Sequence, residues 1–289
     1  MIGTRVLRVR RRVLQAPVLR FRNRDDGRMV TLIGVSHVGE AGYFRRIHDL
    51  ACELEAAGAA VQYEFMRTSS EEEWAAATDE ERAARETLNA RYREQPEPPL
   101  LAAVKQFLRW EYQSDGLALE PSWQNTDISS LDYLRLVGPA TLLVVEDANE
   151  RGMTLLGDGG IARIGGPFAV IFLRLLTLDR FRLITRFVNR APDDRAHSAV
   201  AVGVRNDMAL GALPPSGDSV MIWGADHLAG LRAGLEAAGF RRAGRASWLD
   251  VGRLPGTWGC ARELWAAIRE VRAGSPAQNQ EPDPAPTGN

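Results

Sequence analysis

The sequence of 289 residues contains almost no lysine. Lys105 is the single one, so arginine supplies nearly all of the positive charge, and the formal net charge of -1 leaves no basic excess. A chain without such an excess lacks the electrostatic footprint that draws proteins to nucleic acid or to an acidic membrane. We therefore expect no nucleic acid among its partners.

Cysteine is almost as scarce. Cys52 and Cys260 lie far apart, and neither has a CxxC partner. This spacing argues against a disulfide framework and against a zinc ribbon, which needs closely spaced cysteine pairs. Such cysteine usage favours a reduced, cytoplasmic setting.

Long hydrophobic runs are missing as well. The basic N-terminus alternates apolar residues with arginines, which is not the pattern of a signal peptide. The best candidate for a membrane span is GGPFAVIFLRLLTL, at 165–178, which is interrupted by Arg174. A spanning helix needs about 20 apolar residues, so we predict a buried or interfacial helix there; peripheral membrane contact stays open but is not expected.

What the chain does contain is the composition of a globular protein, with 45% hydrophobic and 25% charged residues. We predict a single domain over residues 1–272, with a helical insertion at about 70–190. The tail at 273–289 is rich in Pro, Gln and Asn, so we predict that it is disordered.

The spacing of apolar residues predicts an α/β fold. Period-two alternation before residue 36 indicates two or three short strands, broken at Ala16-Pro17 and at 25–27. Helical spacing over 42–57 and an apolar stretch at 59–64 complete a strand–helix–strand unit. We predict a central mixed, largely parallel sheet flanked by helices, with a later strand at 220–223 and a helix at 228–238. In the middle of the chain we predict helices at 70–95, 100–112 and 131–137.

Two histidines follow predicted strands in the same way. His37 ends Gly34-Val35-Ser36-His37, and His227 ends Gly224-Ala225-Asp226-His227; each Gly-x-x-His leads into a predicted helix. Ligands of open α/β sheets bind outside the carboxyl ends of strands. There a glycine permits a tight turn, and a histidine can offer one ring nitrogen to a metal.

Glu64 ends the strand after the first crossover. If that crossover is parallel, Glu64 and His37 emerge at the same edge of the sheet. Two histidines and one carboxylate are the ligand set of a hydrolytic divalent-metal site with a position open for water. A capping or packing role is the alternative for each residue, because a single histidine after a strand is a weak signal.

Other polar residues have more than one interpretation. Arg205 and Asn206 lie at a further strand end, where they could stabilise a substrate oxyanion, support the site, or cap a helix. Asp226 could orient a water molecule or His37, or could cap a helix. We expect Asp127 and Asp132 to be helix caps, and His48 and His197 to be solvated surface residues.

Taken together, these motifs resemble the TraB/PrgY/GumN family, which is similar to the TIKI metalloproteases. The resemblance covers residues 29–67 and 199–240 and rests on these segments: GVSH at 34–37, YE at 63–64, RNDM at 205–208, WGADHLAGL at 223–231 and LEAAGF at 235–240. It implies an α/β fold shared with erythromycin-esterase-like and ChaN-like proteins.

The resemblance also implies a metal-dependent hydrolytic site. His37, Glu64 and His227 would be its metal ligands, Glu64 would be a ligand or a general base, and Arg205 and Asn206 would support them. Some family members act on peptides, and others act in pheromone shutdown or have no established activity. We therefore expect a peptidase-like hydrolase that uses Mn, Co or Zn. The alternatives are a non-catalytic peptide-binding or regulatory protein and a small-molecule esterase.

Overall fold

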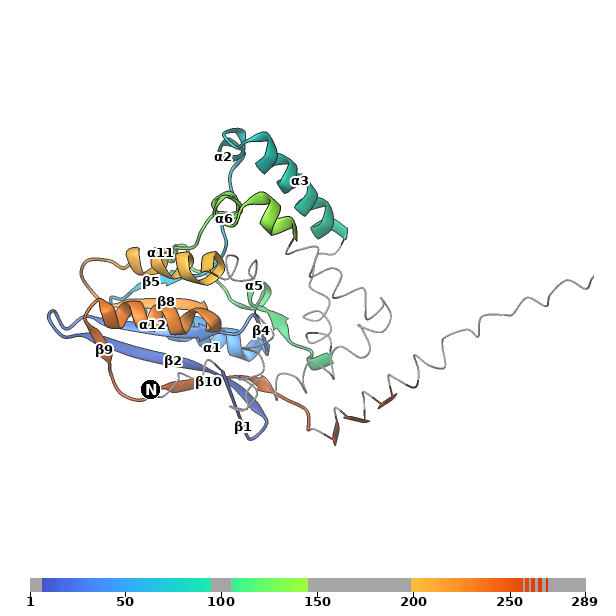
Figure 1. Ribbon diagram of the computed structural model, residues 1–289. Coiled ribbons are helices and arrows are strands. Elements are labelled where there is room, and N and C mark those ends of the chain that lie inside the picture. The colour runs from blue at the N-terminus through green and yellow to red at the C-terminus, as the bar shows by residue number, and fades with distance from the viewer. Residues whose placement is uncertain are drawn as a thin grey trace, which may run out of the picture.

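The computed structural model describes residues 7–94, 105, 107–144 and 199–256, and several positions between 258 and 269 (Figure 1). The predictions for 165–178, for His197 and for the tail at 273–289 concern positions outside the described residues. No helix in the described ranges combines the length and the apolarity that crossing a membrane requires.

A mixed sheet forms the centre of the described chain. Its strands are β1 (Arg8–Arg10), β2 (Val13–Asn23), β3 (Met29–Val35), β5 (Ala60–Tyr63), β7 (Gln124–Asn125), β8 (Ser219–Gly224), β9 (Phe240–Arg242) and β10 (Ser247–Arg253). The order is β1-β2-β3-β8-β5-β7, with β9 and β10 also paired to β2. The run β3-β8-β5-β7 is parallel, whereas every pairing of β2 is antiparallel.

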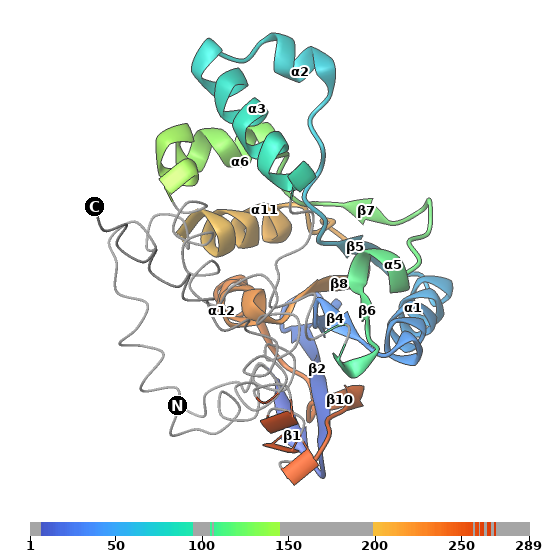
Figure 2. The ribbon, with the colours of Figure 1, turned by 90° about the vertical axis from the view of Figure 1, so that its right-hand side faces the viewer.

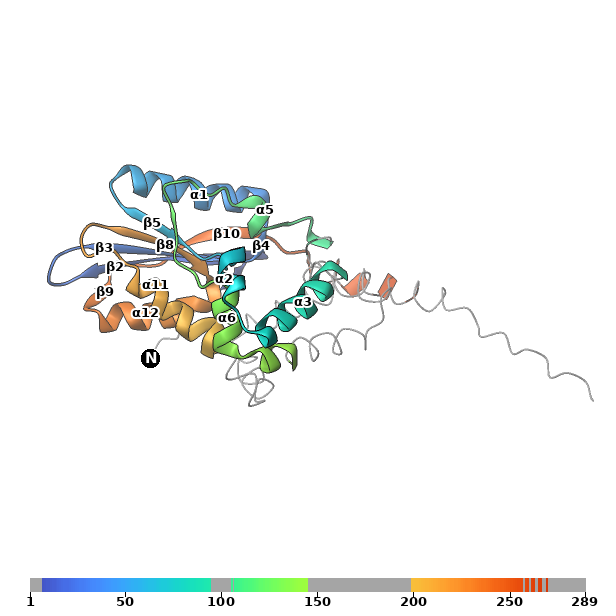
Figure 3. The ribbon, with the colours of Figure 1, turned by 90° about the horizontal axis from the view of Figure 1, so that it is seen from above.

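Helices cover both faces of this sheet, as Figure 3 shows from above. On one face lies α1 (Ala41–Ala56), whose Phe44 and Ile47 belong to a buried cluster with Val61 and Ile222 of the sheet. On the other lie α11 (Arg205–Gly211) and α12 (Leu228–Ala237), which pack against β2, β3 and β8. The predicted α/β fold with a mixed sheet between helices is confirmed.

The strand β8 is buried along its whole length, from Ser219 to Gly224. It pairs in parallel with β3 on one side and with β5 on the other. A parallel strand with helices over both faces has no solvent-facing side, which explains its continuous apolar sequence VMIW.

The predicted strand break at Ala16-Pro17 is wrong, because β2 runs through both residues. Pro17 lies opposite Trp248 of β10, and the pairing of β2 with β3 reaches only to Val18 and Ile33. Proline has no N–H to donate, so it is tolerated just beyond the end of that ladder.

A third cluster is built from the middle of the chain. It contains α2 (Glu71–Ala75), α3 (Asp79–Glu94) and α6 (Ser130–Val137), which lie above α11 in Figure 2. The single helix predicted at 70–95 is two helices. Ser70 caps the start of α2, and a second cap, in which Thr78 and Glu81 exchange hydrogen bonds, starts α3.

The helix predicted at 100–112 is wrong at its end, although Lys105, Phe107 and Leu108 are helical as predicted. Glu111–Tyr112 is the strand β6, which pairs with β4 (Val38–Gly39) directly after His37. The short helix α5 (Gln113–Gly116) follows, so this segment lies beside the turn that carries His37.

Candidate active site

Three adjacent parallel strands bring the predicted site residues to one edge of the sheet. Val35 of β3 lies beside Gly224 of β8, and the N–H of Glu64, just past β5, donates to the Ile222 carbonyl. His37, Glu64 and His227 all line one pocket of about 490 Å³. The convergence follows from the parallel order β3-β8-β5, because all three strands end on the same side.

Glu64 is the buried centre of this pocket. Its Oε1 accepts a 2.6 Å hydrogen bond from Arg205 Nη2 and lies 3.3 Å from Nε2 of His227. Its Oε2 accepts from the backbone N–H of Gly224. Burial alone would raise the pKa of Glu64, but His227, Arg205 and the Gly224 N–H together lower it to about 2. Glu64 is therefore an ionised carboxylate at neutral pH.

His227 is buried and fixed on two sides. Its Nδ1 lies 2.8 Å from Oδ1 of Asn206, and its ring stands edge-on to Trp223 with centroids 5.1 Å apart. The amide oxygen can only accept, so Nδ1 carries a proton, and Nε2 faces Oε1 of Glu64. A Cβ on Gly230 would overlap the Asn206 amide, so the glycine in HLAG leaves room for this orientation.

Arg205 connects Glu64 to a second carboxylate. The prediction that Arg205 and Asn206 lie at a strand end is wrong, because they begin α11 directly after the π-helix Ala199–Val204. The Nε and Nη2 of Arg205 donate to the two oxygens of Asp127 at 2.7 and 2.6 Å, and the Asp127 side chain is fully buried. The prediction that Asp127 caps a helix is wrong, because Ser129 is the N-cap of α6. The parallel pairing of β7 with β5 brings Asp127 to the same edge as Glu64. Arg205 thus positions Glu64.

The charges of this group cancel only if His227 is a cation. Glu64 and Asp127 carry two negative charges and Arg205 carries one positive charge, so one negative charge remains if His227 is neutral. A net charge in a buried site is costly unless something neutralises it. Either a second proton on His227 or a bound cation would do so.

His37 is exposed on the rim of the pocket. Its turn is held by Tyr43, whose hydroxyl accepts from the Ser36 N–H and donates to the Gly34 carbonyl. A Cβ on Gly224 would lie 3.6 Å from His37 Cε1 and 2.9 Å from Glu64 Oε2, so glycine at 224 keeps the space between them open.

The ligand atoms of His37, Glu64 and His227 do not all approach to within 4.8 Å of one another. The three residues line one pocket. Because their ligand atoms do not converge to this distance, their joint role as metal ligands stays a prediction. Asp226 is exposed and also lines this pocket. It does not cap a helix, because Gly224 is the N-cap of the short helix Ala225–His227 that contains it.

A different group of side chains has all its ligand atoms within 4.8 Å of one another. In the part of the chain that the structure describes, His48, Cys52 and Glu120 are the one such group, and they could hold a metal ion. The prediction that His48 is a solvated surface residue is wrong, since its side chain is 25% exposed and bonds to Glu120. This group contains no CxxC motif, so the cysteine spacing did not indicate it. The spacing His-x-x-x-Cys on α1, which places both residues on one helical face, was the available signal.

Comparisons with known proteins place this chain in no established family. No protein-family model matches the sequence, and no curated protein matches it significantly. The geometry of the site is a buried carboxylate–imidazole pair, held by Arg205 and Asn206, that lines a pocket at the ends of three parallel strands.

Proposed function

We propose that this pocket is the active site of a metal-dependent, peptidase-like hydrolase in which His37, Glu64 and His227 hold a divalent ion. The observation that carries the proposal is the Glu64–His227 pair, which is buried at the carboxyl ends of adjacent parallel strands and lines the same pocket as His37. The resemblance of the same residues to TraB/PrgY/GumN motifs supports it.

The donors fit a divalent cation. Asn206 holds His227 by its Nδ1, so Nε2 faces Glu64 in the pocket, which is the orientation that metal-ligating histidines adopt when their other nitrogen is hydrogen-bonded. Imidazole nitrogens with one carboxylate oxygen suit Zn, Mn or Co. The cation would also neutralise the charge that remains on the Glu64–Arg205–Asp127 group.

The low pKa of Glu64 supports one of its two candidate roles, metal ligand over general base. A general base works best when its pKa lies near the operating pH. At about 2, the pKa of Glu64 suits a permanent ligand and not a base. Asp226, an exposed carboxylate on the same pocket, is the residue to which we assign the orientation of water.

A divalent ion at this place would supply Lewis-acid polarisation of a carbonyl and a lowered pKa of water. The residues of the chain would do the rest. Arg205 and Asn206 hold Glu64 and His227 in place, and Phe65 and Met66 add partly exposed apolar surface to the pocket wall. This combination of polar floor and apolar wall suits a peptide or ester with an apolar side chain.

Metal analysis tests the proposal in a Cys52→Ser background, which removes the other candidate cluster. We expect about one equivalent of Mn²⁺, Co²⁺ or Zn²⁺ in that protein and its loss on adding His37→Ala with His227→Ala. Equal metal content in both proteins would overturn the metal site. Arg85→Ala, on exposed α3, is the control for a general effect of substitution.

A substrate panel then defines the reaction. Cleavage of peptides that is lost with His227→Ala supports the peptidase-like assignment. Cleavage of esters alone would replace it with the esterase. Binding of a peptide without product, unchanged by Glu64→Gln, would replace it with a non-catalytic binding protein.

A further inference from the structure

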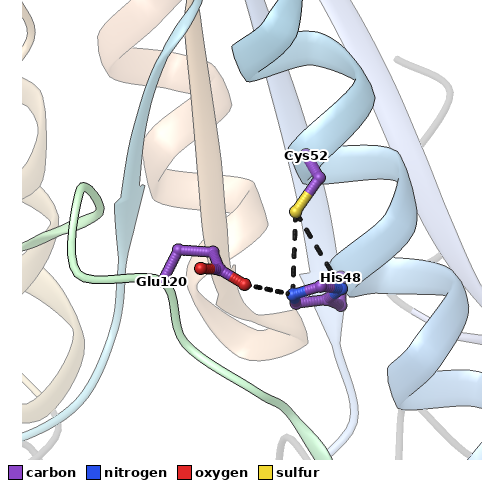
Figure 4. A group of neighbouring side chains, drawn as sticks. All are labelled: His48, Cys52 and Glu120. Carbon is purple, nitrogen blue, oxygen red and sulfur yellow. Dashed lines mark hydrogen bonds and ion pairs between the residues drawn. The ribbon is translucent and has the colours of Figure 1, made fainter.

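His48, Cys52 and Glu120 form a cluster (Figure 4) on α1, which covers the opposite face of the sheet from α11 and α12 (Figure 3). His48 and Cys52 are four residues apart on α1, and Glu120 comes from the segment between α5 and β7. Nε2 of His48 is 2.8 Å from Glu120 Oε1 and 3.6 Å from Cys52 Sγ. All three side chains are partly buried.

These distances are close to those around zinc. With bonds of about 2.0 to 2.3 Å, two donors on a tetrahedral zinc ion are about 3.5 Å apart. The His48–Cys52 separation of 3.6 Å already matches, and the Glu120 carboxylate at 2.8 Å needs to withdraw by about 0.7 Å. The Asp49 carboxylate lies 3.6 Å from His48 Nδ1, on the side of the ring that faces away from Glu120.

The surroundings of Cys52 are acidic. Burial raises the pKa of its thiol, and the charges of Glu120, Glu55 and Asp49 raise it further. A divalent cation would relieve this concentration of negative charge. Trp123 closes the cluster on one side, because its ring packs 5.6 Å from the His48 ring and its Nε1 donates to Glu55.

We propose that His48, Cys52 and Glu120 form a second divalent-metal site, selective for Zn²⁺, that fastens the segment 117–123 to α1. The thiol selects a soft ion, because thiolate binds Zn²⁺ in preference to Mn²⁺ or Mg²⁺. With three protein ligands, the fourth position is left to water or to a further carboxylate. This site uses none of the residues of the proposed active site and does not depend on its function.

Fastening this segment has a consequence for the pocket. Its upstream end is α5, whose Gln113 and Ser114 line the pocket. Its downstream end leads through β7 to Asp127, which holds Arg205 against Glu64. Zinc at the second site would therefore stiffen the frame of the pocket without entering it.

Cobalt spectroscopy tests the proposal directly. Co²⁺ bound by a thiolate gives a sulfur-to-metal charge-transfer band, and the proposed active site contains no cysteine. We expect this band in the full-length protein, in Cys260→Ser and in the His37→Ala, His227→Ala double variant, and its loss in Cys52→Ser. A band that survives Cys52→Ser, or none in the unaltered protein, would overturn the proposal.

A second variant guards against misfolding of Cys52→Ser. Glu120→Gln removes the ligand that comes from the segment, and we expect Zn²⁺ to bind roughly tenfold or more weakly, measured by calorimetry. Zn²⁺ should also raise the melting temperature of the unaltered protein more than that of Glu120→Gln. Equal affinity and an equal rise in both proteins would remove Glu120 from the site and would contradict the proposal.

Discussion

The two polar clusters of this protein, Glu64–His227–Arg205–Asp127 and His48–Cys52–Glu120, are built in different ways. The first collects three residues from beyond the ends of parallel strands and Arg205 from the start of α11, and its ionic groups are almost entirely buried. The second takes two residues from one helix and one from a neighbouring segment, and it stays partly exposed. Burial makes the first cluster costly to disturb, whereas solvent screens the second.

The largest expected effect tests this difference by removing Arg205. Arg205→Ala leaves Glu64 and Asp127 as buried carboxylates without their cation, and we expect a loss of about 3–5 kcal/mol in the free energy of unfolding. Urea unfolding at pH 7 measures it. The control is Arg85→Ala, which breaks a solvent-screened pair with Glu71 and a cation–π contact with Trp74 and should cost about 2 kcal/mol or less. Similar losses of unfolding free energy in both variants would show that the buried cluster is no more costly to disturb than a surface pair.

The pH dependence of the metal-free protein probes the same cluster. The pKa of Glu64 is lowered from 4.5 to about 2 in the folded protein. The unfolded state therefore binds more protons between these values, and the stabilisation is full above about pH 4.5 and lost as the pH falls toward 2. The difference corresponds to about 3 kcal/mol. Unfolding curves of Glu64→Gln should lack this part of the acid dependence; an identical acid dependence would show that Glu64 is not its source.

Asn206 offers a sharper test of how His227 is oriented. Asn206→Ala removes the acceptor for Nδ1–H, and we expect metal affinity and activity to fall about 10–100-fold. Asn206→Asp keeps an acceptor at this place and should restore most of the loss. If both variants behave alike, the hydrogen bond to His227 is not what orients the ring.

The smallest effect is expected at the second cluster. In the metal-free protein the hydrogen bond to Glu120 raises the pKa of His48, against a smaller opposing effect of burial. This contribution to stability is present at low pH and is lost as the pH rises through the folded pKa. Glu120→Gln should lower the pKa of His48 in an NMR titration, and Glu86→Gln on exposed α3 should leave it unchanged. A pKa that does not move would place His48 outside the influence of Glu120.

Local signals in the sequence were enough to locate many of the elements. Alternation and helical spacing identified β3, α1, β5, β8 and α12 to within a few residues. The repeated Gly-x-x-His motif and Glu64 marked three of the residues that share the pocket. These features are readable because side-chain periodicity and glycine turns depend on the local backbone alone.

Only the tertiary structure decided which distant residues meet. The insertion of β8 between β3 and β5 placed His227 beside Glu64, and the pairing of β7 with β5 turned Asp127 from an expected helix cap into the partner of Arg205. The packing of segment 117–123 on α1 likewise gave His48 and Cys52 the carboxylate of Glu120. Strand order and the docking of a segment depend on how the whole core packs, so no window of neighbouring residues contains them.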